Sequence, residues 1–91
     1  MVQRYRQEIR QIILENHAQN PRIFGSVARG EDTESSDLDI VIDPTPVLTY
    51  FDIGAMMTEI EDRFNLKVDI ATPNALPVKF REKVLSMAVP L

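Results

Sequence analysis

A layered α/β domain is the fold that this sequence predicts, and three observations support it. Segments with helical and strand periodicity alternate along the chain in the order helix, strand, short turn of helix, strand, helix, strand, helix. The chain is 44% hydrophobic and 26% charged, which is typical of globular proteins. Its 91 residues suffice for one hydrophobic core, so we expect residues 1–91 to form a single domain.

The first helix and the first strand are predicted from the spacing of apolar residues. Five of them share one side of a helix, namely Val2, Tyr5, Ile9, Ile12 and Ile13. We expect Asn20-Pro21 to end this helix, with the only histidine, His17, solvated near its end. Residues 22–24 then form a short β-capable run that stops at Gly25, which predicts a strand.

A second strand and a capped helix follow. Residues 31–36 are polar and turn-rich, and the β-branched run after them predicts a strand over residues 38–42. Thr49 and Asp52 match a capping box with Asp in place of Glu, so we predict a helix over residues 50–64. Its inward candidates are Phe51, Met56, Ile60 and Phe64.

The last third of the chain predicts one more strand and one more helix. Asn65 suits the left-handed position after a helix, and residues 66–71 alternate as a strand does. A final helix is expected over residues 78–88, entered through Pro77. Its inward candidates are Val78, Phe80 or Arg81, Val84, Leu85 and Ala88. Within the preceding helix, we expect Gly54 to permit the close approach of a neighbouring element.

Charge and composition exclude several classes of function. The formal net charge is −4, the wrong sign for a protein that binds a long nucleic acid by neutralising its phosphates. A compact nucleoside triphosphate remains compatible, because bound magnesium and backbone amides can hold it. No cysteine is present, which excludes disulfides and thiolate zinc sites. Neither a secretory signal nor a membrane-spanning run is visible, so we expect a cytoplasmic protein without a membrane.

The turn after the first strand, residues 25–30, has the character of a phosphate-binding loop. Gly25 lets the backbone approach a ligand, and Ser26 adds a hydroxyl to the amides that point at it. Arg29, just before Gly30, can supply a bidentate cation. The alternative is an ordinary turn between a strand and a helix, with small residues for steric reasons and Arg29 solvated.

Asp37 and Asp39 make the chemical interpretation stronger. Residues two apart on a strand project from the same face, about 6.6 Å apart at the backbone. Two carboxylates that close repel each other beside an apolar core unless a cation compensates them, and magnesium is the expected cation. The alternative is that the strand begins late and both belong to a solvated turn with Ser35 and Ser36.

Asp69 is the third carboxylate of the set. It lies between Val68 and Ile70, so alternation turns it away from the side that those two residues bury. If the second and third strands are neighbours, Asp69 lies beside Asp37 and Asp39, and three convergent carboxylates suit a two-metal site. The alternative is a solvent-facing Asp on an exposed strand.

These motifs together resemble a known family. The run from Gly25 to Gly30, the sequence Ser36-Asp37-Leu38-Asp39 and the sequence Val68-Asp69-Ile70 are similar to those of minimal nucleotidyltransferases (MNT proteins) in the DNA polymerase β superfamily. The resemblance implies a small mixed three-stranded sheet packed with about four helices. It implies that Asp37 and Asp39 bind two Mg²⁺ ions, with Asp69 as third ligand and catalytic base. It also implies that Gly25, Ser26, Arg29, Gly30 and Ser36 bind ATP.

The resemblance extends to a partner. MNT proteins of this kind are similar to the antitoxins that pair with an all-helical HEPN ribonuclease toxin. This implies transfer of AMP from ATP to a tyrosine hydroxyl of the toxin, in a hetero-oligomer or homo-oligomer. Two alternatives remain open. One is an antitoxin that masks its toxin without catalysis, and the other is a nucleotidyltransferase that acts on a small molecule or an RNA end.

Overall fold

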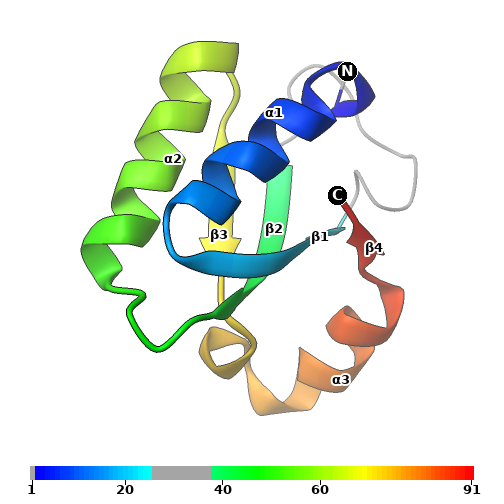
Figure 1. Ribbon diagram of the computed structural model, residues 1–91. Coiled ribbons are helices and arrows are strands. Elements are labelled where there is room, and N and C mark those ends of the chain that lie inside the picture. The colour runs from blue at the N-terminus through cyan, green and yellow to red at the C-terminus, as the bar shows by residue number, and fades with distance from the viewer. Residues whose placement is uncertain (1, 26–37) are drawn as a thin grey trace.

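A mixed sheet lies behind two helices in the computed structural model, which describes residues 2–25 and 38–91 (Figure 1). The elements in chain order are α1 (Val2–Glu15), β1 (Ala18–Phe24), β2 (Leu38–Pro44), α2 (Tyr50–Phe64), β3 (Val68–Ala71), the 3₁₀ turn η1 (Pro73–Ala75), α3 (Val78–Met87) and β4 (Val89–Pro90). This is the α+β architecture that the sequence predicts. The short helical turn expected at residues 28–31 lies outside the described residues.

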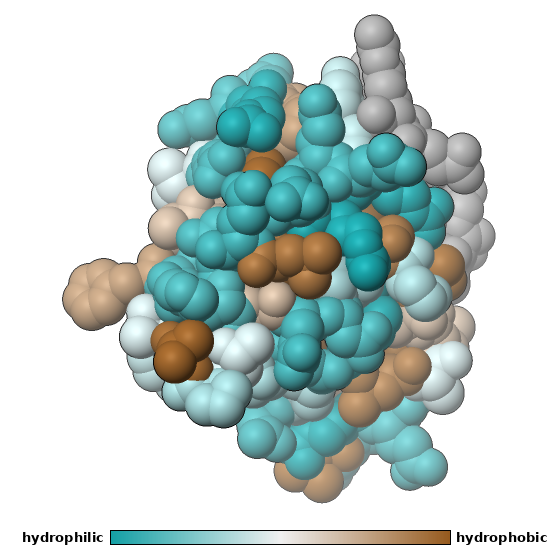
Figure 2. Space-filling view, viewed as in Figure 1, coloured by the Kyte–Doolittle hydropathy of each residue, from teal (hydrophilic) through white to brown (hydrophobic). Residues whose placement is uncertain are grey.

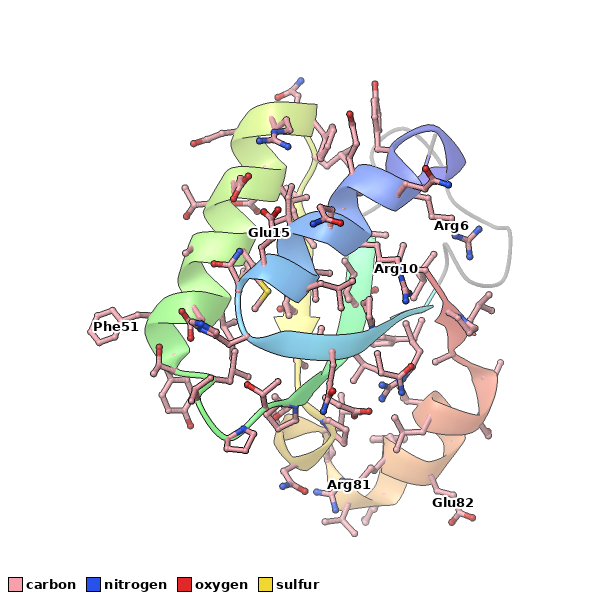
Figure 3. The ribbon with its side chains drawn as sticks, viewed as in Figure 1. Arg6, Arg10, Glu15, Phe51, Arg81 and Glu82 are labelled. Carbon is pink, nitrogen blue, oxygen red and sulfur yellow. The ribbon has the colours of Figure 1, made fainter. Side chains whose placement is uncertain are left out.

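The sheet has the strand order β3-β2-β1-β4. β1 is antiparallel to both β2 and β4, whereas β2 and β3 are parallel, so the sheet is mixed as expected. The expected count of three strands is wrong, because β4 adds a fourth. β4 is only two residues long, and α1 helps to hold this end of the chain: Arg6 donates to the Pro90 carbonyl at 2.5 Å (Figure 3). A strand this short has no periodicity to detect.

The hydrophobic core lies between the two long helices and one face of the sheet. The core residues of α1 and α2 are Ile9, Ile12, Ile13, Met56 and Ile60, and those of β2 and β3 are Leu38, Ile40, Ile42, Val68 and Ile70. The outer face of α1 and α2 is mostly polar, with apolar side chains in small separate patches (Figure 2). Among the described residues, no helix combines the length and apolarity that crossing a bilayer requires.

The first helix ends earlier than predicted. α1 stops at Glu15, and β1 already begins at Ala18, so Asn20-Pro21 lies inside the strand. Asn20 has a φ of 52°, and the register with β2 shifts between Gln19 and Arg22. This irregularity is a β-bulge, which accommodates a proline because a bulged residue leaves the ladder of hydrogen bonds.

Helix α2 matches its predicted boundaries because its capping signals are local. The Asp52 amide donates to Thr49 Oγ1 at 3.2 Å, and the Thr49 amide donates to Asp52 Oδ2 at 3.0 Å. Asn65 ends the helix in the left-handed conformation, as expected. Phe51, however, is 89% exposed and projects away from the molecule (Figure 3). It lies five residues before Met56, a spacing that places the two on different sides of a helix.

Helix α3 buries fewer residues than its apolar pattern predicts. Val78 is 79% exposed, and no residue of the helix is fully buried. Arg81, rather than Phe80, turns inward: its Nε donates to the Pro73 carbonyl at 2.8 Å, and its Nη2 donates to the Leu76 carbonyl at 3.3 Å. Hydrogen bonds from Arg81 therefore help to hold α3 against the preceding 3₁₀ turn, in addition to the packing of the apolar side of the helix.

The expectation for Gly54 is wrong, and this leads to a stability prediction. Among the described residues, no atom beyond the chain neighbours and helix backbone of Gly54 would lie within 4 Å of a Cβ built there, so no neighbouring element approaches it closely. Gly54→Ala should therefore raise the free energy of unfolding by about 1 kcal/mol, since alanine loses less backbone entropy in a helix. Urea denaturation measures this, with Ala55→Gly as the matched reverse change at the next exposed position. Equal stability of Gly54→Ala and the native chain would contradict it.

His17 makes a contact that its place in the sequence does not reveal. Its Nδ1 lies 3.1 Å from Asp52 Oδ2, and its carbonyl accepts a hydrogen bond from the Thr45 hydroxyl at 2.6 Å. The pKa of Asp52 is lowered, first by the hydrogen bond from the Thr49 amide and then by the His17 side chain. Asp52 thus joins the cap of α2 to the turn after α1.

This cap makes part of the stability dependent on pH. A carboxyl whose pKa is lower in the folded state stabilises the fold above its unfolded pKa, and the stabilisation is lost as the pH falls through the folded pKa. We expect Asp52→Asn to lower the urea midpoint at neutral pH, and the difference from the native chain to shrink as the pH falls below the ordinary value of 3.8. A difference that stays constant down to the acid transition would contradict this assignment.

Candidate functional site

Asp39 and Asp69 lie opposite each other on neighbouring strands. β2 and β3 pair in parallel, with Leu38 opposite Val68, Asp39 opposite Asp69 and Ile40 opposite Ile70. The residues on either side of each Asp are buried in the core, so alternation directs both carboxylates to the other face of the sheet. Adjacent strands are about 4.8 Å apart, which allows two carboxylates to share one cation.

Gly25 lies against the first of these carboxylates. It follows β1, whose last residue, Phe24, is the partner of Asp39 in the sheet. Gly25 has a φ of +78°, and a Cβ built on it would lie 2.6 Å from Asp39 Oδ2. Only glycine fits this conformation beside the carboxylate. The sequence predicted that the backbone would approach a ligand closely here, and the neighbour observed is the Asp39 side chain.

Five other predicted site residues lie outside the described residues. They are Ser26, Arg29, Gly30, Ser36 and Asp37. Within residues 2–25 and 38–91, no three acidic, histidine or cysteine side chains gather as a metal-binding group. The described part of the site therefore consists of Gly25, Asp39 and Asp69.

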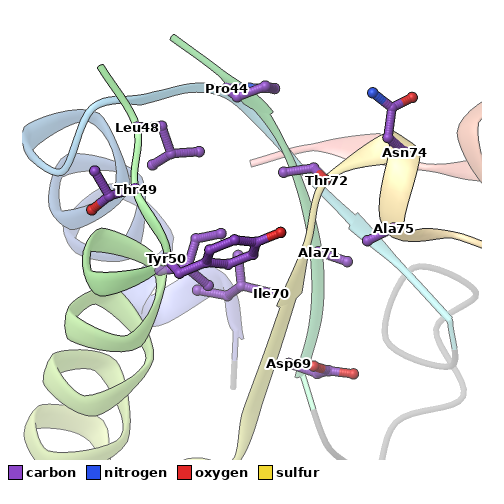
Figure 4. Close-up of a pocket in the computed structure, with 11 residues that line it drawn as sticks. Pro44, Leu48, Thr49, Tyr50, Asp69, Ile70, Ala71, Thr72, Asn74 and Ala75 are labelled. Carbon is purple, nitrogen blue, oxygen red and sulfur yellow. The ribbon is translucent and has the colours of Figure 1, made fainter. Parts of the chain in front are cut away.

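An open pocket of about 720 Å³ borders Asp69 (Figure 4). One wall comes from the beginning of α2 and the residues before it, including Leu48, Tyr50 and Ile53, and the other comes from η1. Asp69 itself is exposed, in contrast to the buried residues beside it in β3. The sequence did not single out Tyr50, because its exposed position in the first turn of α2 has no periodic signal.

A second charged cluster stabilises the irregular part of β1. Arg22 Nη1 lies 3.1 Å from Asp43 Oδ2, and Arg22 Nη2 donates to Asp43 Oδ1 at 3.3 Å. Asn20 Nδ2 also donates to Asp43 Oδ2, at 3.0 Å. The Arg22 side chain is only 13% exposed, so this paired geometry offsets the cost of burying its charge. The cluster thus fixes the bulge against β2.

A small mixed sheet with paired aspartates on adjacent strands, beside a glycine turn, is the arrangement expected of a nucleotidyltransferase. The sequence profile of the polymerase beta nucleotidyltransferase family matches residues 7–91, and the chain belongs to this family. A Methanocaldococcus jannaschii protein, named as a candidate protein adenylyltransferase, is 31% identical over 86% of this chain and 84% of its own length. The resemblance inferred from the motifs is confirmed.

Solved structures agree with this assignment. The structure of a candidate minimal nucleotidyltransferase is 33% identical, with a TM-score of 0.89 over 99% of this chain and 92% of that one. Two less similar chains share the fold. One comes from a toxin-antitoxin complex with AMP-PNP; it is 17% identical, with a TM-score of 0.77 over 92% of this chain and 69% of that one. The other comes from the complex of a tri-AMPylated Shewanella oneidensis HEPN toxin with an MNT antitoxin; it is 16% identical, with a TM-score of 0.73 over 99% of this chain and 71% of that one.

Proposed function

We propose that this chain transfers AMP from ATP to a tyrosine hydroxyl of a HEPN-type toxin and so acts as an antitoxin. The observation that carries the proposal is the pairing of Asp39 with Asp69, next to Gly25, in a chain of this enzyme family. The M. jannaschii relative named for protein adenylylation and the fold shared with a chain of an AMPylated toxin complex support the choice of acceptor.

Asp39 and Asp69, together with Asp37, are the proposed ligands of two Mg²⁺ ions. Carboxylate oxygens on adjacent strands fit a hard divalent cation, because the cation offsets the repulsion between the carboxylates. Bound Mg²⁺ would neutralise charge on the triphosphate and on the oxygens that enter and leave. Gly25, Ser26, Arg29, Gly30 and Ser36 are the proposed contacts of the triphosphate.

Asp69 is the proposed general base. It is exposed and borders the open pocket, where an acceptor hydroxyl can reach it. In the transfer, the tyrosine hydroxyl gives its proton to the Asp69 carboxylate, and its oxygen forms a bond to the α-phosphorus of ATP. The bond between that phosphorus and the bridging oxygen breaks, and pyrophosphate leaves. The product is a tyrosine that carries AMP through a phosphodiester.

The test is incorporation of label into a HEPN-type protein that binds this chain. With α-³²P-ATP and Mg²⁺ we expect label on that protein, whereas γ-³²P-ATP should give none. The same partner with its tyrosines changed to phenylalanine should stay unlabelled. If a folded chain and its partner form a complex without any transfer of label, AMP transfer is excluded.

Masking without catalysis is the second candidate function. Tyr50 and Phe51 are 91% and 89% exposed at the beginning of α2, a placement that suits contact with another protein. The two functions differ in their dependence on Asp39. Full protection of cells from the toxin by the Asp39→Asn chain would favour masking, and loss of protection with retained binding would favour AMP transfer.

A further inference from the structure

We propose that the outer edge of β3 is the docking site for an extended segment of the acceptor protein, which joins the sheet as an added strand beside Asp69. The identification of the occupant as the acceptor rests on the proposed function. The docking itself rests on the edge of the sheet, the pocket that follows it and the charge of that pocket.

The outer edge of β3 is open in the described structure. β3 is the last strand of the sheet, and no other described strand pairs with its outer side. Leu38 donates to the Lys67 carbonyl at 2.8 Å, so Lys67, Asp69 and Ala71 direct their backbone groups toward β2. In a parallel ladder the intervening residues face the other way. The amide and carbonyl of Ile70 therefore point to the open edge.

A hydrogen-bond partner outside the sheet already serves the other outward-facing amide of β3. The Val68 amide, which also faces outward, donates to Glu61 Oε2 of α2 at 3.3 Å. Ile70 lies further along the strand and borders the pocket. A passing peptide can supply a carbonyl for the Ile70 amide and an amide for its carbonyl. This is the pattern by which extended peptides add to exposed sheet edges.

The shape and charge of the pocket suit a peptide. It borders residues 69–72 consecutively, a length of about 13 Å in an extended chain, which fits about four residues of a partner strand. Leu48 and Tyr50 (Figure 4), together with Ile53, provide an apolar wall. Among the described residues that line the pocket, Asp69 alone is charged, and it is acidic, so the pocket favours a neutral or basic segment over an acidic one.

The register of such a strand would place a tyrosine on the correct face. Asp69 projects from the sheet face opposite the core. A residue of the added strand that lies beside Asp69 projects from the same face, with Cβ atoms about 5 Å apart. A tyrosine at that position brings its hydroxyl to the carboxylates, while its sequence neighbours turn toward the apolar wall that contains Tyr50. The sheet edge thus selects which tyrosine is modified.

The test uses a nine-residue synthetic peptide of alternating Thr and Val with a central Tyr. The control peptide has Pro on both sides of that Tyr, which removes the amides a strand needs. On addition of the first peptide, exchange of the Ile70 amide hydrogen should slow about tenfold, measured by NMR. The Asp69 amide, already bonded to β2, should not change. The Pro peptide should have no effect.

Two neighbouring substitutions provide matched variants. Tyr50 and Phe51 are equally exposed, but only Tyr50 lines the pocket. Tyr50→Ala should weaken peptide binding about fivefold or more, while Phe51→Ala should bind as the native chain does. No binding at millimolar peptide, an unchanged Ile70 amide, or equal effects of the two variants would overturn the proposal.

The same measurements separate this inference from the proposed function. Protection of Ile70 by the peptide, combined with no AMP transfer to any HEPN partner, would leave the docking site valid and the proposed reaction wrong. AMP transfer to the partner with no protection of Ile70 in their complex would leave the reaction valid and the docking site wrong.

Discussion

Asp39→Asn should lower the rate of AMP transfer by about 10²–10³-fold or more while the chain stays folded. Asparagine has the same shape as aspartate, but it lacks the negative charge that a divalent cation needs from its ligands. Packing fixes the position of Asp39, because its neighbours Leu38 and Ile40 in this central strand are core residues. Among the described carboxylates, Asp69 alone lies opposite it in the sheet. Initial rates of label transfer at saturating ATP and Mg²⁺ provide the measurement.

The matched control is Asp62→Asn, which removes a carboxylate from an exposed position of α2. It changes the net charge by the same amount, and we expect it to leave the transfer rate within about twofold of the native value. Far-UV circular dichroism and urea midpoints of both variants check that each is folded. A rate for Asp39→Asn within tenfold of the native rate would remove Asp39 from the catalytic site.

Gly25→Ala is the second change with a large expected effect. Alanine at a φ of +78° should cost about 1–2 kcal/mol of the free energy of unfolding. Its Cβ would also lie 2.6 Å from Asp39 Oδ2, so the carboxylate must rotate away from its native position. Because the carboxylate is displaced in the folded state, we expect transfer to fall about 10²-fold, beyond what the loss of stability explains.

Gly54→Ala is the matched control for this substitution, because it adds the same methyl group where no other element of the described structure lies within 4 Å. It should stabilise the chain and leave transfer unchanged. Measurements at a temperature where both variants are fully folded separate the displaced carboxylate from unfolding. Native activity of the folded Gly25→Ala chain would contradict the role assigned to this contact.

Local signals explain what the sequence predicted well. The cap of α2 depends on Thr49 and Asp52, three residues apart, and each makes its bond within a single turn. The core face of β2 follows from the alternation of side chains along a strand, although Val41, which alternation places on the other face, is also buried. The juxtaposition of Asp39 and Asp69 required one further rule, that strands joined through a helix are usually neighbours, and the parallel pairing of β2 with β3 agrees with it.

The features that sequence reasoning missed depend on contacts distant in the chain. The bulge at Asn20-Pro21 is held by Asp43, and β4 exists because β1 offers it an edge. His17 reaches Asp52, which lies 35 residues away. Apolar character alone predicts Phe51 as a core residue, because it does not depend on which side of the helix the residue faces. Its true direction follows from its spacing to Met56, and Ile53 packs against the core instead.

The central claim is that Asp39 and Asp69 hold a divalent cation together. Mn²⁺ binding followed by electron paramagnetic resonance, in the presence of a non-hydrolysable ATP analogue, tests it most directly. We predict that Asp39→Asn and Asp69→Asn each weaken Mn²⁺ binding at least about tenfold. The loss of binding free energy in the double variant should be much smaller than the sum of the two single losses, because both substitutions act on one site. Native Mn²⁺ affinity in either single variant, or strictly additive losses in the double variant, would contradict the claim.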